Sequence, residues 1–284
     1  MTYQEAYQKA EEILRQQDMA DASSDAWILL EYVTGMTRTR YYVDGDLHMP
    51  EEEEGEFFRL IEARRGHIPV QHLTGSQEFM GMEFQVNEHV LVPRQDTEIL
   101  VEAAEKRLRQ MKMPAEVLDL CTGSGCIPIS LKVRNPEAHF CGTDISWKAL
   151  QTARKNAEKL EADVEFVESD MFGQIQGKYD LITSNPPYIP TKLIQELAEE
   201  VRLHDPFEAL DGREDGLHFY RILAKESPRY LKDGGWLYVE IGYDQSEAVE
   251  SLLRENGFAQ VGTQKDLAGL DRVVSGVYNR HSVD

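Results

Sequence analysis

The chain has 284 residues, of which 41% are hydrophobic and 29% charged, and its formal net charge is −21 at pH 7. This composition excludes a disordered chain, and the length predicts one large domain with a smaller one. The negative charge disfavours extended contact with DNA or RNA, so we expect no direct nucleic-acid partner. No apolar run reaches about 18 residues and the N-terminus lacks a signal-peptide pattern, so we expect a cytoplasmic protein with no membrane partner.

The first part of the chain has the periodicity of helices. Apolar residues recur at three- and four-residue spacing over residues 3–14 and again over 26–33. Gly35 stands where a helix C-cap belongs, and the four glutamates of 51–54 suit the positive N-terminal end of another helix. We therefore predict a small helical domain of at least three helices over residues 1–70.

A change of pattern follows. Residues 71–93 contain two short β-prone pieces separated by Gly81, which predicts a β-hairpin that connects two domains. From residue 94 to residue 284, a first helix leads into strands that alternate with helices, and this pattern indicates a mostly parallel sheet covered on both faces. The expected strands are 117–120, 139–143, 164–167, 179–182, 236–239, 258–261 and 272–278. No helix separates the last two strands, which must pair antiparallel if they are neighbours.

A turn of small residues follows the first of the parallel strands. It consists of Cys121, Thr122, Gly123, Ser124 and Gly125, and a helix comes directly after it. Such a turn lets a ligand approach the backbone, although a glycine-rich turn can also be purely structural. Neither the GxGxxG nor the GxxxxGK[ST] phosphate-binding pattern is present.

Two acidic residues indicate what the turn binds. Asp144 follows the second strand, where a carboxylate can accept hydrogen bonds from ribose hydroxyls. Asp119 stands beside the turn and favours a cationic ligand, such as the ammonium and sulfonium groups of S-adenosylmethionine, over a pyrophosphate. The sequence therefore predicts S-adenosylmethionine as the ligand.

These residues resemble the first motif of the class I methyltransferases, roughly DxGxGxG, with Cys121 in place of the first glycine. The segment with Asp170, Met171 and Phe172 resembles the adenine pocket of that family. The resemblance implies that Asp170 accepts from the adenine amino group and that Met171 or Phe172 covers the ring, while core packing is the alternative for both apolar residues. The cysteines lack the spacing of a zinc site, and we expect no metal.

The most specific motif is Asn185-Pro186-Pro187-Tyr188, directly after the fourth strand. Loops at this end of an open α/β sheet bind ligands, and the two prolines keep the loop rigid. An amide nitrogen is a poor nucleophile and must be oriented. We expect the Asn185 side-chain oxygen and the Pro186 carbonyl each to accept one N–H of a planar NH2 group, with Tyr188 against its face. We therefore predict these four residues to be catalytic and Asn185 also to border the cofactor.

The target of such a motif can be the amino group of adenine or a carboxamide. Nearly the whole chain resembles the protein-(glutamine) methyltransferases of the HemK or PrmC family, which modify peptide chain release factors. The matching segments are the helical N-terminal region, Arg64-Arg65, Gly75, Glu78-Phe79, residues 92–98, the glycine turn, residues 185–188, residues 209–212, residues 215–217 and residues 240–242. Gln95 replaces the commoner proline of the family's PRPDTE segment, which is either a wall of the active site or a helix cap at a domain hinge.

The resemblance implies a Rossmann-like class I methyltransferase fold, with a seven-stranded sheet whose last strand is antiparallel, plus a helical substrate-recognition domain. It also implies methylation of the glutamine in the GGQ motif of a release factor, which is then the partner protein. A ribosomal protein as acceptor stays open. The acidic charge disfavours an adenine methyltransferase, which must bind phosphates and extrude a base, and the intact motif disfavours a nonenzymatic binding protein.

Overall fold

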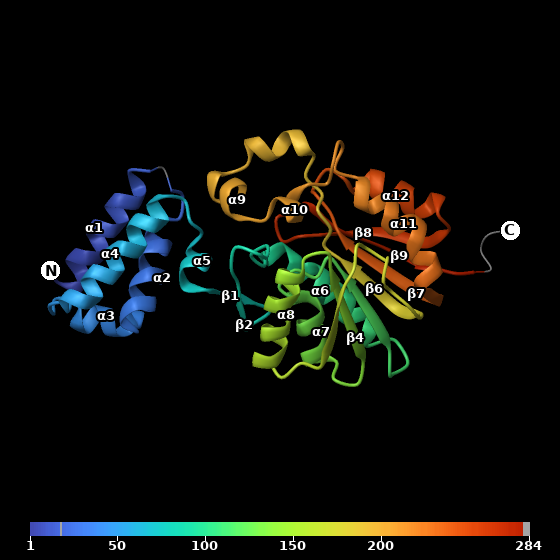
Figure 1. Ribbon diagram of the computed structural model, residues 1–284, viewed down its shortest axis with the longest axis horizontal. Helices are drawn as coiled ribbons and strands as arrows, with labels where there is room; N and C mark the ends of the chain where they lie inside the picture. Colours follow the sequence, from blue (N-terminus) through green and yellow to red (C-terminus); the bar gives the residue numbers. More distant parts are fainter. Residues whose placement is uncertain (18, 281–284) are drawn as a thin grey trace. The chain divides into compact units, whose positions relative to one another are not determined.

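The computed structural model describes residues 1–17 and 19–280, and the chain forms two compact units (Figure 1). The first consists of Met1–Ser76 together with Ala198–His204. The second consists of Gln77–Leu197 and the chain from Asp205 onward. The first unit therefore includes a short segment that lies between two stretches of the second in sequence.

The first unit is helical, as predicted. Its helices are α1 (Tyr3–Arg15), α2 (Ala22–Thr34), α3 (Arg38–Asp44), α4 (Glu51–Arg65), α5 (Val70–Thr74) and α9 (Glu199–His204). A capping box joins Thr2 and Glu5 at the start of α1. Gly35 ends α2 in the left-handed conformation, with φ of 63°, which a glycine adopts without steric cost. Apolar residues of α1, α2 and α4 form the core of this unit.

One buried ion-pair group fixes α9 within the first unit. The Arg64 guanidinium is 7% exposed and lies 2.7 Å from Asp25 Oδ2 and 2.6 Å from Glu200 Oε2. His67 Nε2 adds a contact of 2.9 Å with Glu199. Removing one partner of a buried pair of this kind costs about 3–5 kcal/mol, because the other charge is left without compensation.

The second unit begins with the predicted hairpin and continues as an α/β fold. The hairpin strands are β1 (Ser76–Phe79) and β2 (Met82–Gln85), and the larger sheet consists of β3 (Glu116–Leu120), β4 (His139–Asp144), β5 (Val164–Glu168), β6 (Tyr179–Ser184), β7 (Leu231–Glu240), β8 (Phe258–Lys265) and β9 (Asp271–Tyr278). The helices are α6 (Gln95–Leu108), α7 (Cys126–Arg134), α8 (Trp147–Lys159), the 3-10 helix η1 (Thr191–Glu196), α10 (Phe207–Leu210), α11 (His218–Tyr230) and α12 (Ser246–Glu255).

The sheet has the strand order β5-β4-β3-β6-β7-β9-β8. Strands β3 to β7 pair in parallel, and β9 is antiparallel to both β7 and β8. This confirms the predicted seven-stranded sheet with an antiparallel last strand. The strand order reverses between β3 and β6, and the crevice at the carboxyl ends of such neighbours is where open α/β sheets bind ligands.

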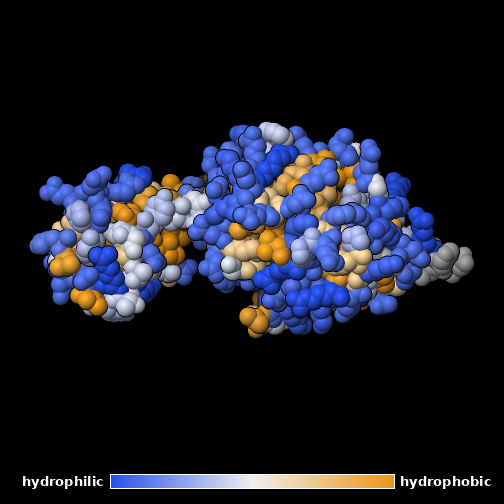
Figure 2. Space-filling model, turned by 90° about the horizontal axis from the view of Figure 1, so that it is seen from below, coloured by the Kyte–Doolittle hydropathy of each residue, from blue (hydrophilic) through white to orange (hydrophobic). Residues whose placement is uncertain are grey.

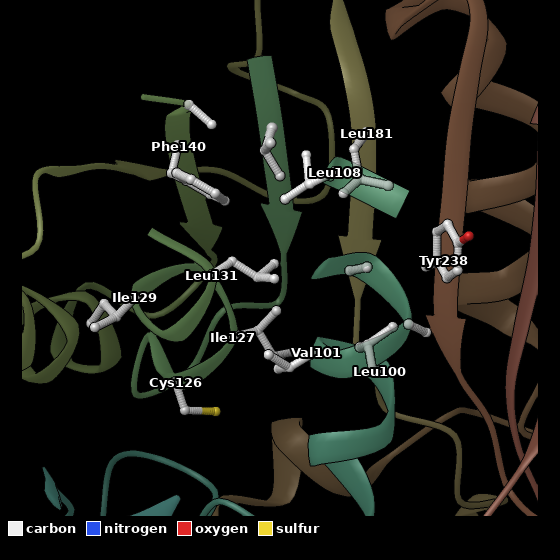
Figure 3. Close-up of a cluster of buried hydrophobic side chains, with 14 of the residues drawn as sticks. Leu100, Val101, Leu108, Cys126, Ile127, Ile129, Leu131, Phe140, Leu181 and Tyr238 are labelled. Atoms are coloured by element: carbon white, nitrogen blue, oxygen red, sulfur yellow. The ribbon is translucent and has the colours of Figure 1, made fainter. Parts of the chain in front are cut away.

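Alternating side chains of the strands supply two apolar layers. Val117, Phe140 and Leu181 belong to one layer with apolar residues of α6 and α7, and Figure 3 shows labelled side chains of these helices together with those of β4 and β6. Leu118 and Ile182 belong to the opposite layer, which α11 and α12 cover. Truncating a fully buried leucine in such a layer costs about 2–5 kcal/mol. The face drawn in Figure 2 is mostly hydrophilic, with hydrophobic residues between the polar ones.

Candidate active site

The turn after β3 has a left-handed backbone at three positions. Cys121, Gly123 and Gly125 have φ angles of 59°, 54° and 79°. A Cβ added to Gly125 would lie 2.8 Å from the Ile129 side chain, whereas one added to Gly123 would meet nothing within 4 Å. Cys121 therefore keeps the conformation that a glycine favours, and the backbone at Gly123 faces open space.

The carboxylate of Asp144 is tied to this turn by backbone amides. Its Oδ2 accepts from the Gly123 N–H at 2.9 Å, and its Oδ1 accepts from the Ser146 N–H at 2.9 Å. Burial raises the pKa of Asp144, and these amide bonds oppose the rise. The next residue, Ile145, is 59% exposed although it is apolar. Sequence reasoning missed Ile145, and its signal was an isoleucine directly after the acid that ends β4.

Asp119 lies beneath the turn. Its side chain is fully buried, and its Oδ1 accepts from the Thr183 hydroxyl of the neighbouring strand β6 at 2.7 Å. Burial raises the pKa of Asp119 to about 7, which outweighs the lowering effect of the Thr183 hydrogen bond. The fully buried carboxyl of Asp119 is thus held against β6 by Thr183.

The three residues expected at an adenine ring differ in exposure. Asp170 is exposed, whereas Met171 and Phe172 are 8% and 6% exposed and belong to the core. The Phe172 ring stacks on Tyr230 with centroids 4.6 Å apart, and the Met171 sulfur lies 3.8 Å from Cys121 Sγ. Most of the surface of the Met171 and Phe172 side chains is therefore in contact with core residues.

The Asn185 side chain is oriented by α6. Ser184, the last residue of β6, is followed by Asn185, whose Nδ2 donates to the Thr97 hydroxyl in the first turn of α6 at 3.3 Å. Within the described residues no hydrogen bond reaches Asn185 Oδ1 or the Pro186 carbonyl. Pro186 is buried and Tyr188 partly so, and burial raises the pKa of the Tyr188 phenol. The loop thus presents two acceptors without partners.

Residues 185–189 are named the catalytic loop after their predicted role. Glycines pack against the backbone of this loop, and Gln245 donates a hydrogen bond to it. A Cβ on Gly212 would lie 2.7 Å from the Tyr188 carbonyl carbon, and one on Gly216 would lie 2.4 Å from the Tyr188 oxygen. The Gln245 Nε2 donates to the Tyr188 carbonyl at 3.0 Å and to the Gly216 carbonyl at 3.3 Å. A parallel bridge joins Ile189 to Asp211. Residues 211–216 and Gln245 therefore form a brace for residues 185–189.

A further acidic side chain lies beside Asn185. Glu240, the last residue of β7, is 2% exposed, and sequence reasoning assigned it no role. Burial raises its pKa to about 7, against smaller opposing effects of Thr97, Arg272 and Asn185. An acidic residue directly after the apolar run of residues 236–239 was the available signal.

Among residues 1–17 and 19–280, no group of three or more His, Cys, Asp or Glu side chains is placed to hold a metal ion. No helix in the same residues is long and apolar enough to cross a membrane.

Comparisons with known proteins cover almost the whole chain. Residues 5–75 match the family model described as PrmC N-terminal domain, and residues 95–204 match the one described as Methyltransferase small domain. The release factor glutamine methyltransferase of Geobacter sulfurreducens is 40% identical over 93% of this chain and 92% of its own length. That of Caulobacter vibrioides is 41% identical over 98% of this chain and 97% of its own length.

Solved structures share the fold at low sequence identity. The catalytic domain of hMettl16, in complex with an RNA hairpin, has a TM-score of 0.59 and 16% identity over 75% of this chain and 81% of that chain. A methyltransferase from Pyrococcus furiosus has a TM-score of 0.53 and 15% identity over 77% of this chain and 99% of that chain. At such identities the likeness concerns the fold alone.

Proposed function

We propose, because the chain belongs to the release factor glutamine methyltransferase family, that it transfers the methyl group of S-adenosylmethionine to the side-chain amide nitrogen of a glutamine in a protein. The acceptor we propose is the glutamine of the GGQ motif in a peptide chain release factor. The observation that carries this proposal is the pair of unpartnered acceptors in the catalytic loop, Asn185 Oδ1 and the Pro186 carbonyl.

The turn after β3 fits the cofactor. Gly123 leaves room for close approach to the backbone, and the Asp144 carboxylate, which the amides of Gly123 and Ser146 anchor, keeps lone pairs for the ribose hydroxyls. Ile145, exposed beside this acid, would cover one face of the adenine, and the exposed Asp170 would accept from its amino group. The buried Asp119 favours positive charge above the turn.

S-adenosylmethionine supplies an electrophilic methyl group on a positively charged sulfur. The protein must aim the lone pair of an amide nitrogen, which is normally delocalised into the carbonyl. Asn185 Oδ1 and the Pro186 carbonyl would each accept one N–H of the target, so that the lone pair is directed out of the amide plane. No residue has to remove a proton first, because the nitrogen becomes acidic once it carries the methyl group.

We propose further that the helical first unit recognises the acceptor protein. Two of its apolar side chains, Tyr42 and Val43 in α3, are 81% and 78% exposed. Exposed tyrosines often act as anchors in protein interfaces, and Val43 adds apolar area beside Tyr42. Changing both to serine should raise KM for an intact release factor by about 10-fold or more, equivalent to about 1.4 kcal/mol, and leave KM for a short GGQ peptide unchanged. Equal KM values for the intact factor would contradict this assignment.

The proposed activity is tested with labelled S-adenosylmethionine and a purified release factor, followed by peptide mapping. We expect label on the GGQ glutamine alone and none on a factor in which that glutamine is asparagine. Asn185→Ala should slow single turnover by about 100- to 1000-fold, while Gln264→Ala, at an exposed position of β8, should leave it unchanged. Label on a ribosomal protein or an adenine-containing oligonucleotide instead of the factor would refute the proposed acceptor.

A further inference from the structure

Glu240 is the last residue of β7, and Asn185 directly follows β6, its parallel neighbour, at the same edge of the sheet. In the register of β6 and β7, Ser184 lies opposite Val239, so the next residue of each strand, Asn185 and Glu240, meets the other just beyond the paired region. Thr97, at the start of α6, completes the group, because it accepts from Asn185 and lies beside Glu240.

The burial of this carboxylate is only partly compensated, because Thr97, Asn185 and Arg272 lower its pKa by less than burial raises it. A buried carboxylate is costly unless it is paired. The Arg272 guanidinium, the nearby cation, forms its ion pairs with Asp96 at 3.0 Å and Asp266 at 2.9 Å, and no ion pair of the described residues joins it to Glu240. Glu240 Oε2 is buried without a hydrogen bond of ordinary geometry in the described part of the chain. A buried charge kept in this way, next to a catalytic loop, indicates a role in the reaction.

We propose that Glu240 is a positioning residue that acts through Thr97 and Asn185: its carboxylate holds Asn185 Nδ2 towards the sheet and thereby directs Asn185 Oδ1 towards the target amide. This inference rests on the proposed function. Glu240 is itself too deeply buried, at 2% exposure, to touch an acceptor glutamine.

The orientation of the Asn185 carboxamide depends on which neighbouring groups can donate a hydrogen bond and which can only accept one. The carboxamide of asparagine presents a donor and an acceptor of similar shape, and a half-turn about its last bond exchanges them. The Thr97 hydroxyl both donates and accepts, so by itself it tolerates either orientation. An ionised carboxylate only accepts, so it repels Oδ1 and favours Nδ2. Glu240 thus removes the orientation in which a donor would face the N–H groups of the target.

Protonation of Glu240 would weaken this selection, because a neutral carboxyl can donate to Oδ1. The groups that act on its pKa are Arg272 of β9, which lowers it, Asp96 of α6, which raises it, and the polar side chains of Thr97 and Asn185, which lower it. Burial outweighs them and leaves the pKa at about 7. The rate should therefore rise with pH through this region.

The test compares Glu240→Gln, which can donate as well as accept, with Glu240→Asp, which can only accept. Glu105→Gln serves as a control, because Glu105 is a buried acid of α6 that pairs with Arg109 and Arg134 outside the site. We expect Glu240→Gln to lower kcat by up to about 100-fold, the cost of a misdirected contact, and Glu240→Asp to recover part of it. The affinity for S-adenosylhomocysteine, measured by calorimetry, should stay within about 2-fold of wild type. The control should keep the wild-type rate.

The pH profile of kcat/KM separates positioning from a purely structural role. The wild type should show a rising limb near pH 7, and Glu240→Gln should lack it. Asp119 also has a pKa raised to about 7, and a limb that persists in Glu240→Gln would belong to it and would overturn the proposal. A wild-type kcat, or a loss of cofactor affinity and melting temperature in parallel with the rate, would overturn it as well. Failure of the wild type to label any release factor would instead refute the proposed function, and the role of Glu240 with it.

Discussion

Gly212→Ala should disturb the catalytic loop without touching a catalytic side chain. The added Cβ would lie 2.7 Å from the carbonyl carbon of Tyr188, 2.8 Å from its Cα and 2.8 Å from the Cα of Gly216. All three atoms belong to the backbone, so no side-chain rotation relieves the contact. To reach an ordinary separation of 3.4 Å, the Tyr188 carbonyl must move by about 0.7 Å. Gly212 has no positive φ, so the whole effect comes from lack of space.

The expected cost has two parts. Overpacking a tight site costs about 1–3 kcal/mol of unfolding free energy, which chemical denaturation measures. Displacement of reacting groups by about 1 Å costs up to about 100-fold in rate, which single turnover with saturating cofactor measures. Gly262→Ala is the matched control in β8, because a Cβ there meets nothing within 4 Å. Equal stability and rate in Gly212→Ala and the wild type would show that the brace does not determine the position of the loop.

Other substitutions address the cofactor, the brace, the helix start and the buried acid. Asp144→Ala should weaken S-adenosylhomocysteine binding by about 10- to 100-fold in calorimetry, through loss of the charged acceptor, and unchanged affinity would exclude a ribose role. Gln245→Glu should lower the unfolding free energy by about 1–3 kcal/mol, because a carboxylate cannot donate to the Tyr188 carbonyl, whereas equal denaturation midpoints would argue against the contact. Gln95→Pro should raise the unfolding free energy by about 0.4–1 kcal/mol, because the first residue of α6 donates no backbone hydrogen bond among the described residues. A lower unfolding free energy in this variant would contradict the expectation. Burial raises the pKa of Asp119 to about 7. Its protonated form therefore stabilises the fold fully below about pH 4, and this contribution is lost as pH rises through 7. Asp119→Asn should flatten that part of the plot of unfolding free energy against pH, and an unchanged slope would be evidence against the raised pKa.

The fold followed from local patterns in the sequence. Short apolar runs separated by amphipathic helices predicted the parallel strands, and the missing helix before residues 272–278 predicted the antiparallel pair that β8 and β9 form. The grouping of residues 198–204 with the first unit was not predictable in this way. It depends on ion pairs of Arg64 and His67 with glutamates more than a hundred residues away, and no local periodicity encodes such pairs.

The candidate site was predictable where its residues adjoin a strand end in a recognisable motif. Asn185 to Tyr188 and Asp144 are of this kind, and their roles stay predictions. Glu240 was not assigned a role, because its relation to Asn185 depends on the register between β6 and β7, which only the assembled sheet defines. Register arguments become possible once the strand order is known, since the carboxyl ends of parallel neighbours share an edge.

The chemistry of the catalytic loop explains why a brace is needed outside the motif. Pro186 and Pro187 have no backbone N–H, so this loop has fewer of the donors with which other loops fasten themselves to neighbouring backbone. In the proposed mechanism its acceptors must also stay free for the target amide. Besides the Asn185 side-chain bond to Thr97, the loop is held by bonds further along and by close packing, as Gln245 and Gly212 provide at Tyr188. A loop that binds an NH2 group through its own acceptors must be stabilised by other segments. Here these are residues 211–216 and Gln245, where only glycine fits at Gly212 and only a donor side chain can replace Gln245.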